Sequence, residues 1–353
     1  MSKIKYFFPP FFILQRKKNK LRPFISIYNK RNGPGIRMER LIKVFGNSYF
    51  NPNLLYAQSG WNIDYLYETL KKSKKANIPF ILNQNGWYYP AWYKGDWKKA
   101  NDYLVKAHKE SHLSVFQSQF CLESMKELTN VEPRNYKIIY NCVPQLSNTY
   151  IERGKLSRAI IWLSGVFNED AVHILEPALK AIEILNYELK EYSPKLKIGG
   201  YFSDTAKKST WFKDINKKIN TLIEKDLCCW IGKYDYYNLK DLTSDVSLAL
   251  HLTNKDSCPN AVLERMSLSI GHVYSNSGGT PELIRDSGIG LDTQKNWFRQ
   301  IPVNVDQLID GIKLGLDKKE ILGKKAFDRV SKQFKFDDYI AKLERIFIDN
   351  LNK

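Results

Sequence analysis

Hydrophobic positions along the chain follow two alternating periods. Short apolar runs, such as residues 78–83, 159–164 and 246–252, are typical of buried strands. Between them lie longer segments in which apolar residues return every three or four positions, as over residues 63–76 and 172–187. This second spacing predicts amphipathic helices. Because strands that alternate with helices favour parallel sheets covered on both faces, the pattern predicts an α/β protein.

The expected elements form two series, separated by a polar, aperiodic segment at residues 147–157 that we expect to link two domains. In the first series, strands are expected at residues 4–8, 23–28, 53–58, 78–83, 113–117 and 137–140, a turn at 32–35, and helices at 36–45, 63–76, 98–111 and 119–128. In the second, strands are expected at 159–164, 196–199, 228–231, 246–252 and 272–275, and helices at 172–187, 213–225, 239–243, 259–267, 281–286, 305–316, 318–334 and 337–351.

The N-terminal apolar run, residues 6–14, follows Lys3 and Lys5, as in a signal peptide. No small-residue cleavage site follows it and two prolines interrupt it, so we expect a strand instead. No other segment approaches about 18 uninterrupted apolar residues, which predicts no transmembrane helix. The five cysteines are an odd number without a Cys-x-x-Cys pair, which argues against a secreted disulfide framework and a structural zinc site. The expected location is cytoplasmic.

The charge is strongly basic, with 55 Lys and Arg against 37 Asp and Glu, a net of +18. Such an excess attracts phosphorylated substrates, anionic membranes or nucleic acid without choosing among them. The lysine runs at residues 16–18, 71–75 and 98–99 are either solvated surfaces or a peripheral contact with an anionic membrane. No RNA- or DNA-binding motif is present, so nucleic acid is not expected as a partner.

Two consecutive strand–loop–helix units in residues 250–282 carry the clearest chemistry. In the first, Pro259 is expected to begin a helix; in the second, Thr280 is expected to cap the helix that Pro281 begins. Gly278 and Gly279 allow the backbone to approach a ligand closely. Because loops at the carboxyl edge of a parallel sheet present backbone N–H groups, the two units predict a phosphate site.

Two acids accompany this predicted phosphate site. Asp256 lies in the first loop and Glu264 lies about one and a half turns into the helix that follows, so both can face one crevice. A carboxylate accepts two hydrogen bonds from neighbouring donors, which suits the hydroxyls of a sugar or a ribose.

The run Asp-Ser-Cys-Pro-Asn-Ala-Val-Leu-Glu at residues 256–264, followed by Ser-Gly-Gly-Thr-Pro-Glu at 277–282, resembles the donor signature of glycosyltransferase family 4. Residues 116–120 and 138–143 also look like the end of that family's first domain. The family comprises retaining enzymes of the GT-B fold. The resemblance implies a Rossmann-like acceptor domain at residues 1–150, a Rossmann-like nucleotide-sugar domain at 151–334, a donor cleft between them, and a C-terminal helix at 335–353 that packs back on the first domain.

The resemblance also implies roles for individual residues. Asp256 stands where the family contacts donor-sugar hydroxyls, and Glu264 where it binds the ribose; we take both as the catalytic candidates. The remaining donor-binding candidates are Gly232, Lys233, Ser257, Cys258, Pro259, Asn260, Ala261, Gly278, Gly279 and Thr280, and the acceptor-side candidates are Gly33, Pro34, Gly35, Gln84, Asn85 and Trp87.

The chain departs from the family pattern at the diphosphate. Residues 165–170 lack the Arg and Lys that usually neutralise it, so helix N-termini or a cation such as Lys233, Lys255 or Arg265 would have to stabilise the leaving group. No Asp-x-Asp motif occurs, so we expect neither a catalytic metal nor a cofactor.

Other signals allow more than one interpretation. The aromatic side chains of residues 86–97 either stack on a sugar ring, anchor the protein at a membrane interface, or pack beneath a long loop. His108 and His112 have metal-ligand spacing but no third ligand, which favours a surface pair. His251 could face the crevice, although a core histidine is the simpler interpretation.

The sequence therefore predicts an enzyme that transfers a sugar, with retention and without metal, from a nucleotide-sugar donor to a glycan or lipid-linked acceptor in surface polysaccharide or glycoconjugate synthesis. The main alternative is a non-catalytic nucleotide-sugar or glycan-binding protein on the same fold.

Overall fold

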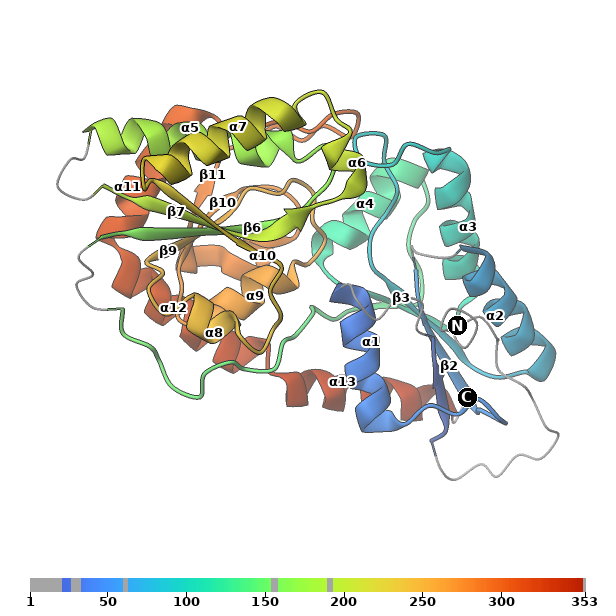
Figure 1. The fold of residues 1–353 in the computed structure, drawn as a ribbon. Coiled ribbons are helices and arrows are strands. Elements are labelled where there is room, and N and C mark those ends of the chain that lie inside the picture. Colours follow the sequence, from blue (N-terminus) through green and yellow to red (C-terminus); the bar gives the residue numbers. More distant parts are fainter. Residues whose placement is uncertain (1–20, 27–32, 60–62, 154–157, 189–192, 352–353) are drawn as a thin grey trace, which may run out of the picture. The chain divides into compact units, whose positions relative to one another are not determined.

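The computed structural model describes residues 21–26, 33–59, 63–153, 158–188 and 193–351, so the strand expected at residues 4–8 lies outside the described residues. The chain divides into two compact units (Figure 1): unit 1 comprises Met1–Cys142 and Phe336–Lys353, and unit 2 comprises Val143–Lys335. Each unit holds a parallel sheet with helices on both faces. This confirms the predicted α/β fold class of two Rossmann-like domains.

Unit 1 is built on a five-stranded parallel sheet in the order β1-β2-β3-β4-β5. Its strands are β1 (Pro23–Ile25), β2 (Leu54–Gln58), β3 (Phe80–Gln84), β4 (Leu113–Phe116) and β5 (Tyr136–Ile138). Its helices are α1 (Gly33–Phe45), α2 (Ile63–Ala76), α3 (Trp97–Glu110), α4 (Gln119–Thr129) and α13 (Phe336–Leu351).

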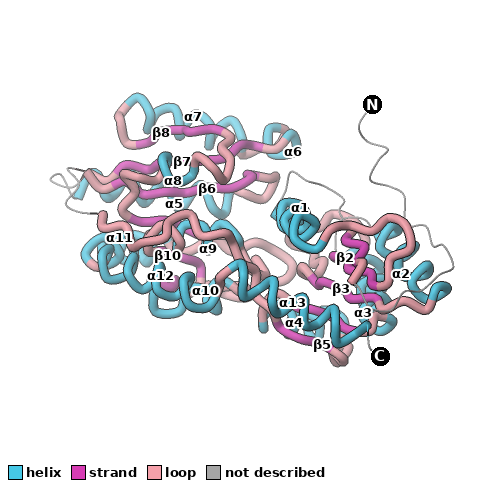
Figure 2. Tube along the Cα trace, turned by 90° about the horizontal axis from the view of Figure 1, so that it is seen from below, coloured by secondary structure: helices cyan, strands magenta, loops and turns pink. Residues whose placement is uncertain are grey.

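The two faces of this sheet are covered by different helices. Leu66 of α2, Leu104 of α3 and Met125 of α4 pack on one face, and Met38 of α1 and Phe347 of α13 pack on the other. Figure 2 shows strands β2 and β3 between α1 and α3. The last helix of the chain therefore completes the core of the first unit.

Unit 2 is built on a six-stranded parallel sheet in the order β11-β10-β9-β6-β7-β8. Its strands are β6 (Ile160–Phe167), β7 (Lys195–Phe202), β8 (Cys228–Gly232), β9 (Leu248–His251), β10 (His272–Ser275) and β11 (Gly288–Leu291). Its helices are α5 (Val172–Glu188), α6 (Asp204–Lys207), α7 (Phe212–Glu224), α8 (Leu239–Leu242), α9 (Asn260–Met266), α10 (Thr280–Ile284), α11 (Val305–Asp317) and α12 (Lys319–Gln333). The strand order reverses between β6 and β9, which is the switch point at which ligands of such sheets bind.

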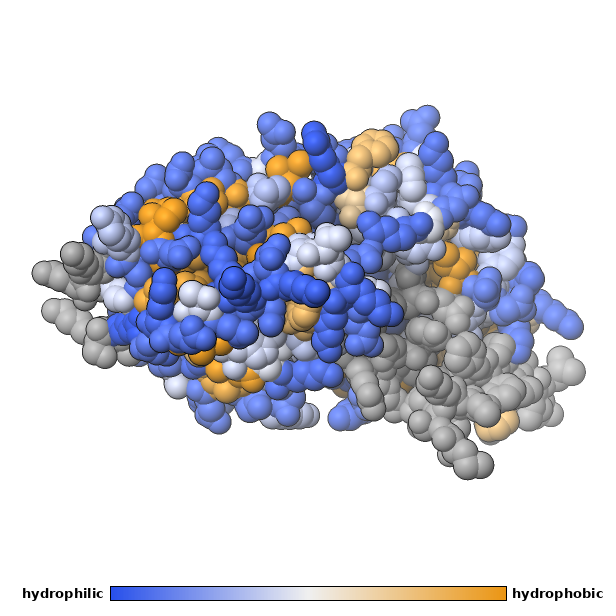
Figure 3. Space-filling model, turned by 45° about the horizontal axis from the view of Figure 1, so that its top comes forward, coloured by the Kyte–Doolittle hydropathy of each residue, from blue (hydrophilic) through white to orange (hydrophobic). Residues whose placement is uncertain are grey.

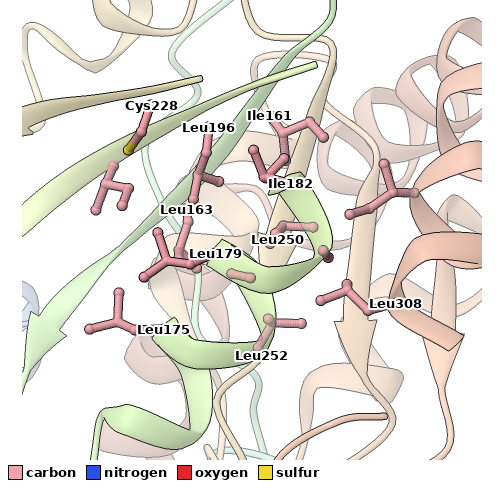
Figure 4. Packing of buried hydrophobic residues seen from close by; sticks show 14 of the residues in the cluster. Ile161, Leu163, Leu175, Leu179, Ile182, Leu196, Cys228, Leu250, Leu252 and Leu308 are labelled. Atoms are coloured by element: carbon pink, nitrogen blue, oxygen red, sulfur yellow. The ribbon is translucent and has the colours of Figure 1, made fainter. Parts of the chain in front are cut away.

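The larger core lies between this sheet and α5, α7 and α11. Leu175, Leu179 and Ile182 recur at helical spacing on α5 and point toward Leu163 and Leu250 of the sheet (Figure 4). Each of these side chains is at most 1% exposed, and full burial of one such side chain contributes about 1.5–3 kcal/mol. The apolar residues of α5 recur every 3.6 positions because one side of the helix packs on the sheet.

Three expectations about elements were wrong in detail. The turn expected at residues 32–35 is helical from Gly33, because a proline fits the first turn of a helix without losing a hydrogen bond. A loop was expected at residues 165–170, but strand β6 continues to Phe167. The apolar run ends at Gly165, whereas the backbone pairing with β7 continues for two more residues. Strand β11 was missed because its two glycines give no strand pattern.

Candidate functional site

The loops that follow β9 and β10 are held together by their backbones. The Gly279 N–H donates to the carbonyl oxygen of Asp256 at 2.7 Å, and the Lys255 N–H donates to Ser277 Oγ at 3.1 Å. Gly278 has φ +72°, and a Cβ there would lie 2.4 Å from the Asp256 carbonyl oxygen. The two runs that carry the family resemblance therefore form one surface at the carboxyl edge of the unit 2 sheet.

Asp256 is partly exposed on this surface, and its carboxylate is ordered by the loop. Its Oδ1 accepts a hydrogen bond from the Cys258 N–H at 3.1 Å. Burial raises the pKa of Asp256 to about 6, against the opposing effect of this hydrogen bond. The acid is thus held in a fixed, partly desolvated position with a pKa close to neutral, as is common at functional sites.

Helix α9 divides its residues between the core and this surface. Val262, Arg265 and other positions are buried, whereas Asn260, Ala261 and Glu264 are partly exposed. Positions separated by three or four residues share one face of a helix, so these three candidates lie on the same side. The structure thereby brings Glu264 onto the exposed face of the helix that follows the Asp256 loop.

The starts of α9 and α10 differ by one residue from the expectation. Pro259 is the N-cap of α9, which begins at Asn260, and Thr280 is the first residue of α10, whose N-cap is Gly279. Thr280 therefore does not cap α10, because Pro281 occupies the second helical position with its fixed φ. The Thr280 Oγ1 and Asn260 Oδ1 atoms are buried and bond to no described atom. Each helix start therefore has a buried polar atom whose hydrogen-bonding capacity is unused.

The three cations considered for the diphosphate lie in different surroundings. Lys255, in the Asp256 loop, is 5% exposed and donates to Gln300 Oε1 at 2.9 Å; burial lowers its pKa to about 8, opposed by the charge of Asp170. Lys233 is exposed, with its ammonium 4.3 Å from the centre of the Tyr201 ring. Arg265 is fully buried. Lys255 is thus the cation that lies in the same loop as Asp256, with its ammonium held by Gln300.

Sequence reasoning missed two residues that support Lys255. Gln300 accepts from the Lys255 ammonium and donates from its Nε2 to Asp170 Oδ2 at 3.0 Å. This chain of contacts joins the end of residues 165–170 to the Asp256 loop. No local pattern could have found it, because 45 and 130 residues separate the partners.

Gly232 and Lys233 lie where β8 ends, and Lys233 helps to line a cavity of about 620 Å³. Gly232 has φ +79° with open space where a Cβ would stand. The cavity is also lined by Tyr201, Phe202 and Trp230 from the sheet and by Asn216 and Asn220 from α7. Its aromatic, amide and cationic groups belong to unit 2, as do the donor-binding candidates.

The acceptor-side candidates of unit 1 are placed by the start of α1 and the end of β3. Gly33, Pro34 and Gly35 form the first turn of α1. Gln84 ends β3, and its Nε2 donates to the Gly86 carbonyl oxygen at 2.6 Å. Asn85 follows; its backbone N–H donates to Ser59 Oγ at 2.9 Å, and its Oδ1 accepts from Arg37 at 2.7 Å.

The aromatic loop after β3 is mainly packed on itself. Trp87 is 5% exposed and donates from Nε1 to the Cys121 carbonyl oxygen at 2.9 Å. The Tyr88 ring lies 4.5 Å from that of Tyr93 and 5.5 Å from that of Trp92, centre to centre. Trp92 is 42% exposed, so it is the ring of this cluster that a ligand can reach most easily.

The histidines have structural roles. The expected surface pair was wrong for His108, which is buried: its Nδ1 bonds to Ser114 Oγ, and its Nε2 accepts from the Arg134 N–H. His112 Nδ1 accepts from the Phe80 N–H. His251 is buried, and burial, with a smaller contribution from Arg265, lowers its pKa to about 3, so it is a neutral core residue.

Among the described residues, no helix combines the length and the apolar character that crossing a membrane requires. On the face shown in Figure 3, hydrophobic residues are scattered among hydrophilic ones.

No protein-family model matches the chain, and no curated protein matches it. Solved structures do. Anabaena HepE in complex with UDP has a TM-score of 0.68 at 13% identity over 88% of both chains. Sucrose-phosphate synthase from Thermosynechococcus elongatus has a TM-score of 0.65 at 11% identity, over 91% of this chain and 79% of that one. A glycosyltransferase from Rickettsia africae has a TM-score of 0.62 at 16% identity, over 92% and 83%.

These likenesses extend over most of each chain at identities too low to carry residue roles. They establish that the chain has the GT-B fold of two Rossmann-like domains.

Proposed function

We propose that this protein is a retaining, metal-independent glycosyltransferase that moves a hexosyl group from a nucleotide sugar to a glycan or lipid-linked acceptor in glycoconjugate synthesis. The observation that carries the proposal is the junction of the Asp256 and Gly278-Gly279 loops at the carboxyl edge of the unit 2 sheet. The complex of Anabaena HepE with UDP, on the same fold, supports a nucleotide-sugar donor.

In this proposal the chain's own residues bind and orient the donor. The Asp256 and Glu264 carboxylates accept hydrogen bonds from sugar and ribose hydroxyls. The Gly278-Gly279 backbone and the first-turn N–H groups of α9 and α10 contact the diphosphate, with the Lys255 ammonium beside them. Because α9 and α10 have seven and five residues, we assign this contact to the N–H groups themselves rather than to a long helix dipole.

The proposed reaction breaks the bond between the anomeric carbon and the diphosphate oxygen and forms a bond to an acceptor hydroxyl oxygen. The nucleoside diphosphate leaves with the bonding electron pair, and the acceptor proton passes to it or to solvent. Interactions that stabilise the departing charge accelerate this step most. The family resemblance supports the retaining outcome, and the lack of an Asp-x-Asp motif in the sequence supports a reaction without a metal.

The second candidate function is a non-catalytic protein that binds a nucleotide sugar or a glycan. It is favoured by residues 165–170, where β6 ends and Asn168, Glu169 and Asp170 follow without a cation. Binding of a donor without turnover in a broad acceptor screen would support this candidate.

The proposal predicts selective release of one nucleotide from a panel of UDP-, GDP- and ADP-sugars, unaffected by EDTA. Asp256→Ala and Glu264→Ala should each lower the release at least tenfold, because each removes a carboxylate that holds the donor, and a factor of ten corresponds to about 1.4 kcal/mol. Initial rates of nucleotide release measure this.

Asp286→Ala is the matched control, because Asp286 is an exposed acid of the same unit paired with Lys325. Its activity should equal that of the wild type. Full activity of the Asp256 and Glu264 variants would remove both residues from the site. Failure of every donor to bind would reject the proposed function.

A further inference from the structure

A buried guanidinium lies at the carboxyl edge of the unit 1 sheet. Arg37 of α1 is 4% exposed, and its terminal nitrogens donate to the side-chain oxygens of Asn141 and Asn85, the latter at 2.7 Å. Gln117 lies between the two asparagines: its Nε2 donates to Asn85 Oδ1, and its Oε1 accepts from Asn141 Nδ2 at 3.2 Å. Asn85, Gln117 and Asn141 follow β3, β4 and β5, so three strand ends converge on one cation.

Nothing in the described structure neutralises this cation. Amide oxygens satisfy its hydrogen bonds but carry no charge. Arg37 makes no ion pair with a carboxylate of the described residues, and its Nε bonds to no described atom. Residues 1–20, 27–32 and 60–62, the internal and N-terminal parts of unit 1 outside the described ranges, contain no Asp or Glu. A buried, uncompensated charge costs several kcal/mol, so a purely structural role would be served better by a neutral side chain.

Arg37 also belongs to the more basic of the two units. The first turn of α1 contains no acidic residue that would offset its N–H groups. Unit 1 carries 27 Lys and Arg against 13 Asp and Glu, a net of +14, which leaves only +4 for unit 2. The positive charge of the chain is therefore concentrated in the unit that contains the Arg37 cluster.

We propose that the cluster of Arg37, Asn85, Gln117 and Asn141 binds an anionic group of the acceptor, either a phosphate or a sugar carboxylate. The inference rests on the proposed function, since it assigns the acceptor class of that enzyme. Guanidinium and amide N–H groups are planar donors that fit both anions, and the anion supplies the missing counter-charge. Rotation of an amide side chain exchanges its oxygen for its N–H₂ group, so the cluster can turn donors toward a ligand.

The test uses the ¹⁵N-labelled full-length chain and follows the Arg37 Nε–H resonance and the side-chain amide resonances of Asn85, Gln117 and Asn141 by NMR. The probes are inorganic phosphate, glucuronate and neutral glucose. We expect saturable shifts with phosphate or glucuronate and none with glucose. The anion that binds more tightly identifies the acceptor group: phosphate indicates a phosphorylated acceptor, and glucuronate indicates an acidic sugar.

Variants of α1 separate binding from architecture. Arg37→Gln should abolish the saturable shifts of the three amides. Arg37→Lys should raise the Kd obtained from these shifts at least tenfold, because an ammonium keeps the charge without the planar pair of donors. Arg40→Gln, which removes one positive charge from a partly exposed position of the same helix, should leave them unchanged. Absence of any anion-dependent shift in the wild type would overturn the inference, as would equal losses in the Arg37 and Arg40 variants.

The same sample distinguishes this inference from the proposed function. UDP is added separately and followed by the backbone amides of Gly278 and Gly279. Shifts with UDP but not with either anion would reject the acceptor assignment alone. Shifts with an anion but with no nucleotide would reject the proposed function, and with it the assignment of the anion as an acceptor group.

Discussion

Asp256 serves two purposes with different atoms. Its backbone oxygen receives the Gly279 N–H and joins two loops, while its carboxylate is ordered by the Cys258 N–H. Burial of the carboxyl, rather than a neighbouring charge, raises its pKa to about 6. One residue thus links the local geometry of the site to its response to pH.

The raised pKa predicts that donor binding strengthens as the pH rises through about 6, because only the ionised carboxylate accepts hydrogen bonds with both oxygens. Asp256→Asn should flatten this dependence. Since the folded protein holds the proton more tightly than the unfolded chain, the free energy of unfolding should also fall as the pH rises from about 3.8 to about 6, and this component should be absent from the variant. Calorimetric titrations with the nucleotide and urea unfolding across this range measure both effects. Parallel profiles for the two proteins would contradict the assignment.

Gly278→Ala should destabilise unit 2 by about 2–4 kcal/mol, because the positive φ is strained for alanine and the added Cβ would meet the Asp256 carbonyl oxygen. Gly232→Ala is the matched control: its φ of +79° is similar, but open space surrounds the position of its Cβ. Urea unfolding of both variants measures the difference. Equal losses would show that backbone strain alone, not contact between the loops, requires glycine at 278.

At the scale of elements, α13 shows how a distant segment completes a domain. Phe347 is fully buried, with its ring centre 5.3 Å from that of Tyr56 and 5.2 Å from that of Phe45. The apolar period of residues 337–351 predicted the helix, but not the strand against which it packs. The partner is decided by the chain's return to unit 1 after residue 335.

Phe347→Ala should therefore lower the free energy of unfolding of unit 1 by about 3–5 kcal/mol, the usual loss for a buried phenylalanine. Ile348→Ala, on the adjacent but 46% exposed position, should cost much less. Hydrogen exchange of the β2 and β3 amides reports the effect where it is expected. Faster exchange confined to α13 itself would show that the helix is dispensable for the sheet.

The accuracy of the predicted elements follows from how local their signals are. The helix at Ile63–Ala76 and the strand at His272–Ser275 were predicted with their observed bounds, because each has a complete period and clear ends. Strand β11 and the end of β6 were missed, since glycines there pair through the backbone alone. The sequence thus predicted helices and strands correctly where a pattern of side chains defines them, and missed them where only backbone hydrogen bonds do.

At the scale of the whole molecule, the two units share a fold class but not a charge. Unit 1 carries a net of +14 and unit 2 a net of +4, although both are built on parallel sheets. The fold of a unit therefore does not fix its net charge. The net charge affects which partners a unit attracts, not how the unit folds.

If the acceptor is anionic, its KM should rise with salt more steeply than the KM of the donor, because screening weakens attraction to unit 1 most. The Debye length falls from about 30 Å at 0.01 M to about 8 Å at 0.15 M. Steady-state kinetics over this range with saturating co-substrate measure the two slopes. Equal slopes would show that the charge of unit 1 does not act on the acceptor.

The sequence by itself determined the alternation of strands and helices, the two-domain α/β class and the pair of loops around Asp256 and Gly278, because these depend on local periods and turn residues. Only the tertiary structure decided which distant side chains meet: Arg37 with Asn141, Lys255 with Gln300, and Phe347 with Tyr56. The physical reason is that such contacts form where parallel strands end at a common edge or where the chain returns to an earlier sheet. Neither arrangement leaves a repeating pattern along the sequence.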